Sequence, residues 1–171
     1  MPQKRSAKRI VIVEDQKATA WALAESLTEE GYETLTAGSS EEALELGLEH
    51  CDVLITDLRL PGMNGIELLS RLKKTRKALP SILITAYSSP DVLASAKKAG
   101  AIRCFSKPFN VEDIKECLKE ALQGRRTVSV SKSPARKGAA DEVSADRRSS
   151  RQRPSRQSRN NSPTHGRVEG A

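Results

Sequence analysis

Short runs of consecutive apolar residues alternate along most of the chain with segments whose apolar residues recur every three or four positions. Runs without polar alternation are typical of strands that are buried on both faces. The predicted strands are Ile10–Val13, Tyr32–Thr36, Val53–Thr56, Ser81–Thr85 and Ala101–Ser106. Tyr32–Thr36 and Ala101–Ser106 include polar residues but also fit strands, so the pattern predicts a sheet of five strands.

A helical segment follows each predicted strand. The predicted helices are Gln16–Glu30, a segment beginning at Ser39 or Ser40, a segment beginning at Asn64 or Gly65, Pro90–Lys98 and Val111–Leu122. Serine before paired glutamates is a typical helix start, proline suits a first turn, and glycine suits a helix end. Strict alternation of strand and helix predicts an α/β fold, a parallel sheet with helices on both faces.

The same pattern predicts which side chains pack inside the fold. The first helix is expected to bury Ala18, Ala22, Leu23 and Leu27, and the second to use Ala43, Leu44, Leu46 and Leu48. Trp21 is interpreted as a packing residue in preference to a partner contact, because aromatic side chains are buried on average. Phe105 is interpreted as plain core.

Charge divides the chain near residue 124. Residues 124–171 contain 12 Lys or Arg against 4 Asp or Glu, a net charge of +8, and no Leu, Ile or aromatic residue follows Leu122. Such a segment cannot bury enough apolar surface to offset the entropy of ordering. We therefore expect a flexible N-terminus at 1–8, a folded domain at 9–123 and a disordered basic Arg/Ser-rich tail at 124–171, with no strand assigned within Thr127–Ser133.

The cysteines and the N-terminus indicate a cytoplasmic protein without membrane association. Cys51, Cys104 and Cys117 are an odd number without metal-ligand spacing, which favours buried or half-buried thiols in a reducing compartment. The apolar run after the basic start stops at Glu14, which is too short for a signal peptide or a membrane span.

Polar side chains lie at the carboxyl ends of four of the five predicted strands. Glu14 and Asp15 follow the first, Asp57 the third, and Lys107 the fifth, while Thr85 ends the fourth. The carboxyl ends of parallel strands form one edge of a sheet, where α/β proteins place their chemistry. Acids and a lysine at that edge are typical of metal-assisted phosphoryl transfer, since Mg²⁺ prefers oxygen ligands and phosphoryl groups need nearby cations.

Each residue also has an ordinary interpretation. Asp57 suits a turn, Glu14 suits a helix start, Lys107 suits a loop, and Thr85 suits a strand. The combination is more informative, because Glu14-Asp15, Asp57–Gly65 (DLRLPGMNG), Ile84-Thr85-Ala86 and Ser106–Phe109 occur in this order. Over Arg9–Gln123 the chain thereby resembles the receiver domain of two-component response regulators.

The resemblance implies a doubly wound, flavodoxin-like sheet of strand order 2-1-3-4-5. It also implies that Asp57 accepts a phosphoryl group from a histidine kinase or phosphotransfer protein. Asp15, Asp57 and the Arg59 backbone carbonyl would hold Mg²⁺, with Glu14 acting through water. Lys107 and Thr85 would contact the phosphoryl group.

Two positions depart from the family pattern. The first acid after the first strand is usually Asp, and here it is Glu14. Receivers commonly carry Tyr or Phe three residues before the lysine, and this chain has Cys104. Alternation along a strand sends Phe105 to the opposite face, so it is no simple substitute. The usual coupling of threonine to an aromatic ring is therefore in question.

The expected function is that of a phosphoacceptor signalling module, not an enzyme in the usual sense. It would bind an unidentified downstream protein when phosphorylated, as a monomer or weak homodimer. One alternative is a receiver-gated regulator whose basic tail binds nucleic acid weakly and nonspecifically, since the tail has no aromatic residues for stacking. Another is a degenerate receiver that only binds a partner.

Overall fold

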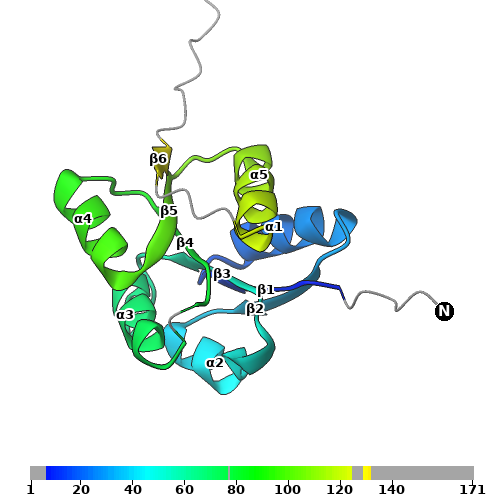
Figure 1. The fold of residues 1–171 in the computed structure, drawn as a ribbon, viewed down its shortest axis with the longest axis horizontal. Helices are drawn as coiled ribbons and strands as arrows, with labels where there is room; N and C mark the ends of the chain where they lie inside the picture. The colour runs from blue at the N-terminus through cyan, green and yellow to red at the C-terminus, as the bar shows by residue number, and fades with distance from the viewer. Residues whose placement is uncertain (1–6, 77, 125–128, 132–171) are drawn as a thin grey trace, which may run out of the picture. The chain divides into compact units, whose positions relative to one another are not determined.

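The computed structural model describes residues 7–76, 78–124 and 129–131 (Figure 1). Its strands are β1 (Arg9–Val13), β2 (Glu33–Ala37), β3 (Val53–Asp57), β4 (Ser81–Thr85), β5 (Ala101–Ser106) and β6 (Ser129–Ser131). Its α-helices are α1 (Lys17–Glu29), α2 (Ser40–Glu45), α3 (Gly65–Thr75), α4 (Pro90–Ala99) and α5 (Val111–Leu122), with a 3₁₀ turn η1 at Leu48–His50. Strands and helices alternate as the apolar pattern predicts.

The strands form one parallel sheet of order β2-β1-β3-β4-β5-β6. Its first five strands confirm the doubly wound order 2-1-3-4-5. The sixth is an addition, because Cys104 of β5 pairs with Val130 at the centre of β6, where the sequence analysis assigned no strand. Three residues carry too little periodicity to identify a strand, and this pairing depends on the edge of β5. The predicted disorder and nucleic-acid binding of the tail concern mainly residues outside the described ranges.

Alternate residues of each strand build two separate apolar layers. Ile10 and Ile12 belong to the layer under α1 and α5, whereas Val11 and Val13 belong to the layer under α2, α3 and α4. Figure 1 shows α1 and α5 on one face of the sheet and the other three helices on the opposite face. Phe105 is 1 % exposed in the first layer, which confirms its assignment to the core. All four β1 side chains named here are buried, as expected for a strand covered on both faces.

Two helix faces differ from their prediction. In α1 the buried residues are Ala20, Leu23 and Leu27, whereas Ala18 and Ala22 are exposed. Trp21 lies outside this stripe and is 65 % exposed, so its assignment as a packing residue is wrong. Because neighbouring alanines extend right around the helix, apolar spacing alone cannot identify the inward face.

The second helix is shorter than predicted. It ends at Glu45, and Gly47 then adopts a left-handed φ of +71°. This turn leaves Leu46 42 % exposed, contrary to the predicted apolar contact, and returns Leu48 to the core within η1. Within the ranges that the structure describes, no helix is long and apolar enough to cross a membrane.

Candidate functional site

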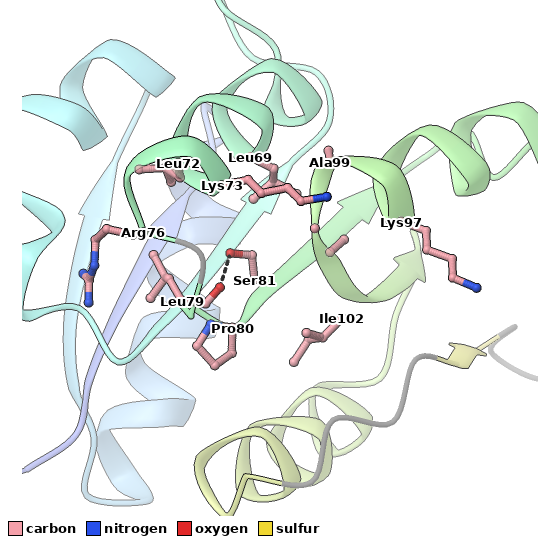
Figure 2. Close-up of a pocket in the computed structure, with 12 residues that line it drawn as sticks. Leu69, Leu72, Lys73, Arg76, Leu79, Pro80, Ser81, Lys97, Ala99 and Ile102 are labelled. Atoms are coloured by element: carbon pink, nitrogen blue, oxygen red, sulfur yellow. Dashed lines mark hydrogen bonds between the residues drawn. The ribbon is translucent and has the colours of Figure 1, made fainter.

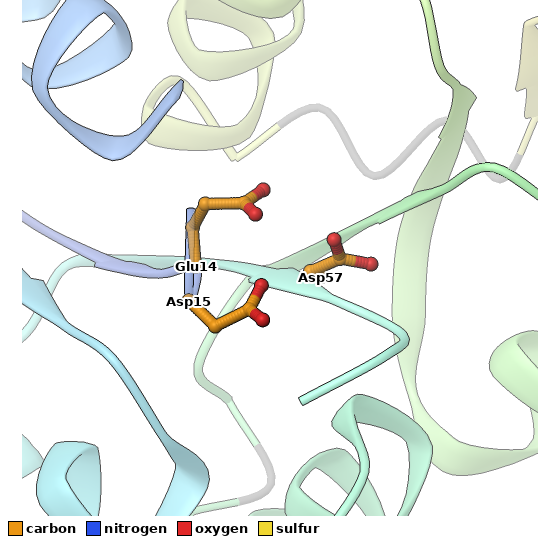
Figure 3. A group of neighbouring side chains, drawn as sticks. All are labelled: Glu14, Asp15 and Asp57. Atoms are coloured by element: carbon orange, nitrogen blue, oxygen red, sulfur yellow. The ribbon is translucent and has the colours of Figure 1, made fainter. Parts of the chain in front are cut away.

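Three carboxylates converge where β1 and β3 end. Asp57 is the last residue of β3, Glu14 directly follows β1, and these two strands are neighbours in the sheet. One carboxylate oxygen from each of Glu14, Asp15 and Asp57 lies within 4.8 Å of the others (Figure 3). Glu14 and Asp57 are buried, whereas Asp15 is exposed at the mouth of the group. The predicted acids therefore form one cluster.

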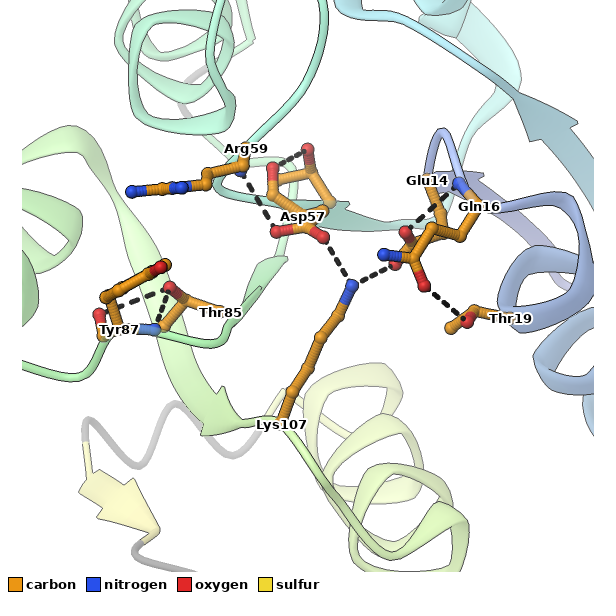
Figure 4. A network of polar contacts seen from close by, with 9 residues as sticks. Glu14, Gln16, Thr19, Asp57, Arg59, Thr85, Tyr87 and Lys107 are labelled. Carbon is orange, nitrogen blue, oxygen red and sulfur yellow. Dashed lines mark hydrogen bonds and ion pairs between the residues drawn. The ribbon is translucent and has the colours of Figure 1, made fainter.

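Lys107 joins this cluster from the end of β5. Its Nζ donates to Glu14 Oε2 at 2.7 Å and also to Asp57 Oδ2 (Figure 4). Burial alone would lower the pKa of Lys107, but the hydrogen bonds and charges of Asp57 and Glu14 outweigh it, so the pKa is raised. The ammonium group therefore stays charged and holds two of the three acids together.

The environment of Glu14 disfavours a negative charge on all three acids of the cluster at once. Burial raises the pKa of its carboxyl; the hydrogen bond from Lys107 lowers it again, and the charge of Asp57 raises it further. The Gln16 backbone N–H also donates to Glu14 Oε1 at 3.3 Å. One lysine against three acids leaves a deficit of positive charge, and a divalent cation would relieve it.

The donor set suits magnesium. Carboxylate oxygens are hard ligands of the kind that Mg²⁺ prefers, and Asp15 keeps one side open for the waters that this ion retains. The backbone of Arg59 lies at the same place, since its N–H donates to Asp57 Oδ1 at 3.0 Å. The residues present therefore fit the ion that the sequence analysis expected.

Thr85 reaches the same edge from the end of β4 and is fully buried. Its hydroxyl accepts a hydrogen bond from the Tyr87 N–H at 2.9 Å and donates to the Tyr87 carbonyl at 3.1 Å (Figure 4). The Thr85 carbonyl accepts from the Lys107 N–H at 2.8 Å. Thr85 therefore lies beside the lysine, with its hydroxyl engaged by the following loop.

The departure at Cys104 has a clear structural setting. Cys104 is buried in the layer under α3 and α4, whereas Phe105 lies in the opposite layer, as strand alternation predicts. Burial raises the pKa of the Cys104 thiol to about 11, so it is neutral and unreactive near pH 7. No aromatic ring therefore occupies the position on β5 where receivers commonly carry one.

The loop between β3 and α3 contributes contacts that the sequence analysis missed. The Arg59 guanidinium stacks on the ring of Tyr87, 4.0 Å from its centroid. The Met63 N–H donates to Glu41 Oε1 of α2 at 3.0 Å. Neither contact has a sequence signal, because each joins segments more than twenty residues apart through residue types that are common on surfaces.

A separate pocket lies at the other edge of the sheet, where β4 and β5 begin (Figure 2). Apolar side chains such as Leu69, Leu79 and Ile102 line it together with Lys73 and Arg76, and its volume is about 280 Å³. Its lining contains no acid, histidine or cysteine. The acids and Lys107 at the carboxyl edge are therefore the better candidate for chemistry.

Comparisons with known proteins agree with this arrangement. The family described as the response regulator receiver domain matches residues 10–119. Sporulation initiation phosphotransferase F of Bacillus subtilis is 35 % identical over 116 residues, which cover 67 % of this chain and 94 % of that protein. The transcriptional regulatory protein PdtaR of Mycobacterium tuberculosis is 36 % identical over 124 residues, covering 71 % of this chain and 60 % of that protein.

Solved structures give the same relationship. The crystal structure of a CheY-like response regulator receiver domain protein from Methanospirillum hungatei has a TM-score of 0.67 and 35 % sequence identity. That similarity covers 70 % of this chain and 97 % of the archaeal one. Both the sequence and the fold of residues 10–119 are therefore shared with receiver domains.

Proposed function

The chain belongs to the response regulator receiver family, and from that premise we propose that Asp57 is its phosphoryl acceptor. Receiver domains are signalling modules of phosphorelays, and this domain is homologous to those of phosphorelay response regulators. The observation that carries the assignment to Asp57 is its place among Glu14, Asp15 and Lys107. It is the one acid of the cluster that ends a central strand.

The proposed reaction is the transfer of a phosphoryl group from a phosphohistidine to the carboxylate of Asp57. A carboxylate oxygen of Asp57 forms a new O–P bond while the P–N bond of a phosphohistidine breaks, and the imidazole leaves with the bonding electron pair. The product is an aspartyl phosphate. Lys107 already contacts Asp57, so its ammonium can follow charge that moves onto the phosphoryl oxygens.

Receiver domains bind Mg²⁺ at an acidic pocket, and this chain has an acidic group at that place. We propose that Asp15, Asp57 and the Arg59 backbone carbonyl hold the ion directly and that Glu14 acts through water. When bound, the ion adds positive charge beside the phosphoryl oxygens. We propose that the Thr85 hydroxyl gives up its hydrogen bonds to the Tyr87 backbone and bonds the phosphoryl group instead.

The partners of this site follow from the family at a coarse level. Receiver domains interact with histidine kinases or phosphotransfer proteins. We propose that this one takes its phosphoryl group from such a donor and then binds a downstream protein, without turning over any further substrate. A beryllofluoride-activated NtrC4 receiver domain is described as a dimer. For this chain we propose a monomer or weak dimer.

The decisive experiment is phosphorylation by acetyl phosphate, resolved on a phosphate-affinity gel. The wild-type chain should give a shifted band that requires Mg²⁺ and disappears with EDTA. Asp57→Asn should give no shifted band, because an amide oxygen is a poor nucleophile. Asp91→Asn is the matched control, since Asp91 is an exposed acid in the first turn of α4, and it should behave like wild type.

Two results would contradict the proposal. A shifted band in Asp57→Asn would place the phosphoryl group elsewhere. The absence of any band in wild type, with acetyl phosphate and with a purified histidine kinase, would favour a degenerate receiver that only binds a partner.

A further inference from the structure

The loop at residues 58–64 joins β3 to α3 and borders the acidic cluster. Both ends of this loop are held by the backbone, because the Leu58 N–H donates to the Ile84 carbonyl at 2.9 Å and the Gly65 N–H donates to the Leu58 carbonyl at 3.0 Å. Between these anchors, the Met63 N–H donates to a side chain, Glu41 Oε1, at 3.0 Å. The middle of the loop is therefore tied to α2.

The loop conformation is matched to the Glu41 side chain. Gly62 has a φ of +73°, and a Cβ at this position would lie 2.8 Å from Glu41 Oε1 and 3.2 Å from its Cδ. The carboxylate therefore packs directly against the turn, and a Cβ at Gly62 would have to displace it. Glu41 therefore meets loop 58–64 in two ways, by packing against Gly62 and by accepting the Met63 hydrogen bond.

An acid in the first turn of a helix often serves only the helix dipole. In α2 the neighbouring Glu42 serves its own helix start, since its backbone N–H donates to the Ser39 Oγ at 3.1 Å and its Oε2 accepts from the Gly38 N–H at 2.6 Å. Glu41 also accepts hydrogen bonds at the helix start, from its own N–H and from the Ser39 hydroxyl, but in addition its carboxylate reaches the loop. The Met63 N–H donates to its carboxylate and thereby lowers the pKa of Glu41, so the ionised form is the one that holds the loop.

We propose that Glu41 is a positioning residue for the site at Asp57. It holds loop 58–64 so that the Arg59 peptide, whose N–H donates to Asp57, presents its carbonyl to Mg²⁺. This inference rests on the proposed function. Loss of the contact frees the middle of the loop, and a hydrogen bond of this kind corresponds to about a three- to tenfold change in affinity.

Three variants of the full chain separate this role from a general effect on α2. Glu41→Ala removes the acceptor, Glu41→Gln keeps an oxygen that can accept from the Met63 N–H, and Glu42→Ala changes the next residue of the same turn. The first readout is hydrogen exchange of the Met63 amide by NMR in the metal-free protein. The second is Mg²⁺ affinity by titration calorimetry at constant ionic strength.

Glu41→Ala should speed exchange at Met63 and weaken Mg²⁺ binding, each by about three- to tenfold. Glu41→Gln should recover most of both, and Glu42→Ala should leave both close to wild type. The inference is overturned if Glu41→Ala leaves Mg²⁺ binding unchanged, or if Glu41→Gln is as impaired as Glu41→Ala. Failure of the wild-type chain to bind Mg²⁺ would instead overturn the proposed function, and the exchange of Met63 would still show whether Glu41 holds the loop.

Discussion

Gly65 is the position where one added methyl group tests the architecture of the site. It is the first residue of α3, and a Cβ there would lie 2.1 Å from the Asp57 carbonyl oxygen and 3.1 Å from Thr56 Oγ1. Cβ atoms essentially never come within 3.0 Å of another heavy atom, so Gly65→Ala must separate α3 from the end of β3 by about 1 Å. The Leu58 N–H bond to Ile84 resists that movement, because it anchors the next residue of the chain.

The magnitude follows from two opposing contributions. Overpacking of this kind costs about 1–3 kcal/mol, whereas alanine in place of glycine at a helical position contributes up to about 1 kcal/mol of stability. The backbone of Gly65 does not lie in the left-handed region, so no backbone strain adds to these two contributions. Because the clash is with a backbone oxygen, it belongs at the upper end of the overpacking range, and we expect Gly65→Ala to lower the free energy of unfolding by about 2–3 kcal/mol.

The assay is urea denaturation followed by far-ultraviolet circular dichroism, because the exposed Trp21 is a poor reporter of the core. Gly38→Ala is the matched control, since its Cβ would meet Glu42 Oε2 at an ordinary 3.4 Å. The control should stay within about 0.5 kcal/mol of wild type or be slightly more stable. A Gly65→Ala protein as stable as wild type would refute the close approach of α3 to Asp57.

Three further predictions concern charges around the sheet. Lys107→Gln should tighten Mg²⁺ binding in calorimetry, because the ammonium no longer competes for two of the acids, while phosphorylation by acetyl phosphate should slow; a fall in both would contradict the assigned role. Glu30→Gln should lower stability in urea at pH 7. Hydrogen bonds from Lys119 and Lys115 lower the pKa of Glu30, so its ionised carboxylate stabilises the fold at pH values above the ordinary pKa of a glutamate. That difference should shrink and then disappear as the pH falls through the lowered pKa of Glu30, and a difference that persists in strong acid would show another cause. Arg59→Ala should cost no more than about 1 kcal/mol of stability and leave Mg²⁺ binding intact, because the proposed ligand is the backbone carbonyl; a large loss of Mg²⁺ affinity would instead implicate the side chain.

The sequence was sufficient for the first five strands of the sheet and for the polar residues at their carboxyl ends. Apolar runs predicted the strands at Ile10–Val13, Val53–Thr56 and Ser81–Thr85, the two more polar segments Tyr32–Thr36 and Ala101–Ser106 fitted strands as well, and the resemblance supplied the order of all five. Once that order is known, the end of β3 must lie beside the end of β1, so Asp57 must lie near Glu14. Lys107 follows β5, two strands along the sheet from β3, and reaches Asp57 although 50 residues separate the two in the sequence. Connectivity therefore brings together residues that composition cannot relate.

The failed predictions share a different cause. The exposure of Trp21 depends on which face of the alanine-rich α1 turns inward, and similar spacings allow more than one answer. The exposure of Leu46 follows from the end of α2 at Glu45 and the left-handed turn at Gly47. The pairing of β6 with β5 depends on an edge elsewhere in the sheet. Glu41 was equally hidden, because an acid in a first turn has an ordinary local explanation and its contact with Met63 is long-range. Local pattern determines elements better than it determines what they touch.

Cys104 shows how far a single departure can be followed. Its sequence position predicts that β5 lacks the usual ring, and strand alternation predicts that Phe105 cannot replace it; the two residues do lie in opposite layers. The sequence could not show which group contacts the Thr85 hydroxyl when β5 carries no aromatic ring. Both hydrogen bonds of its hydroxyl go to the backbone of Tyr87, whose exposed ring carries the Arg59 guanidinium. Because backbone groups are common to all residue types, only the structure places the partner of Thr85 on the loop after β4 instead of on β5.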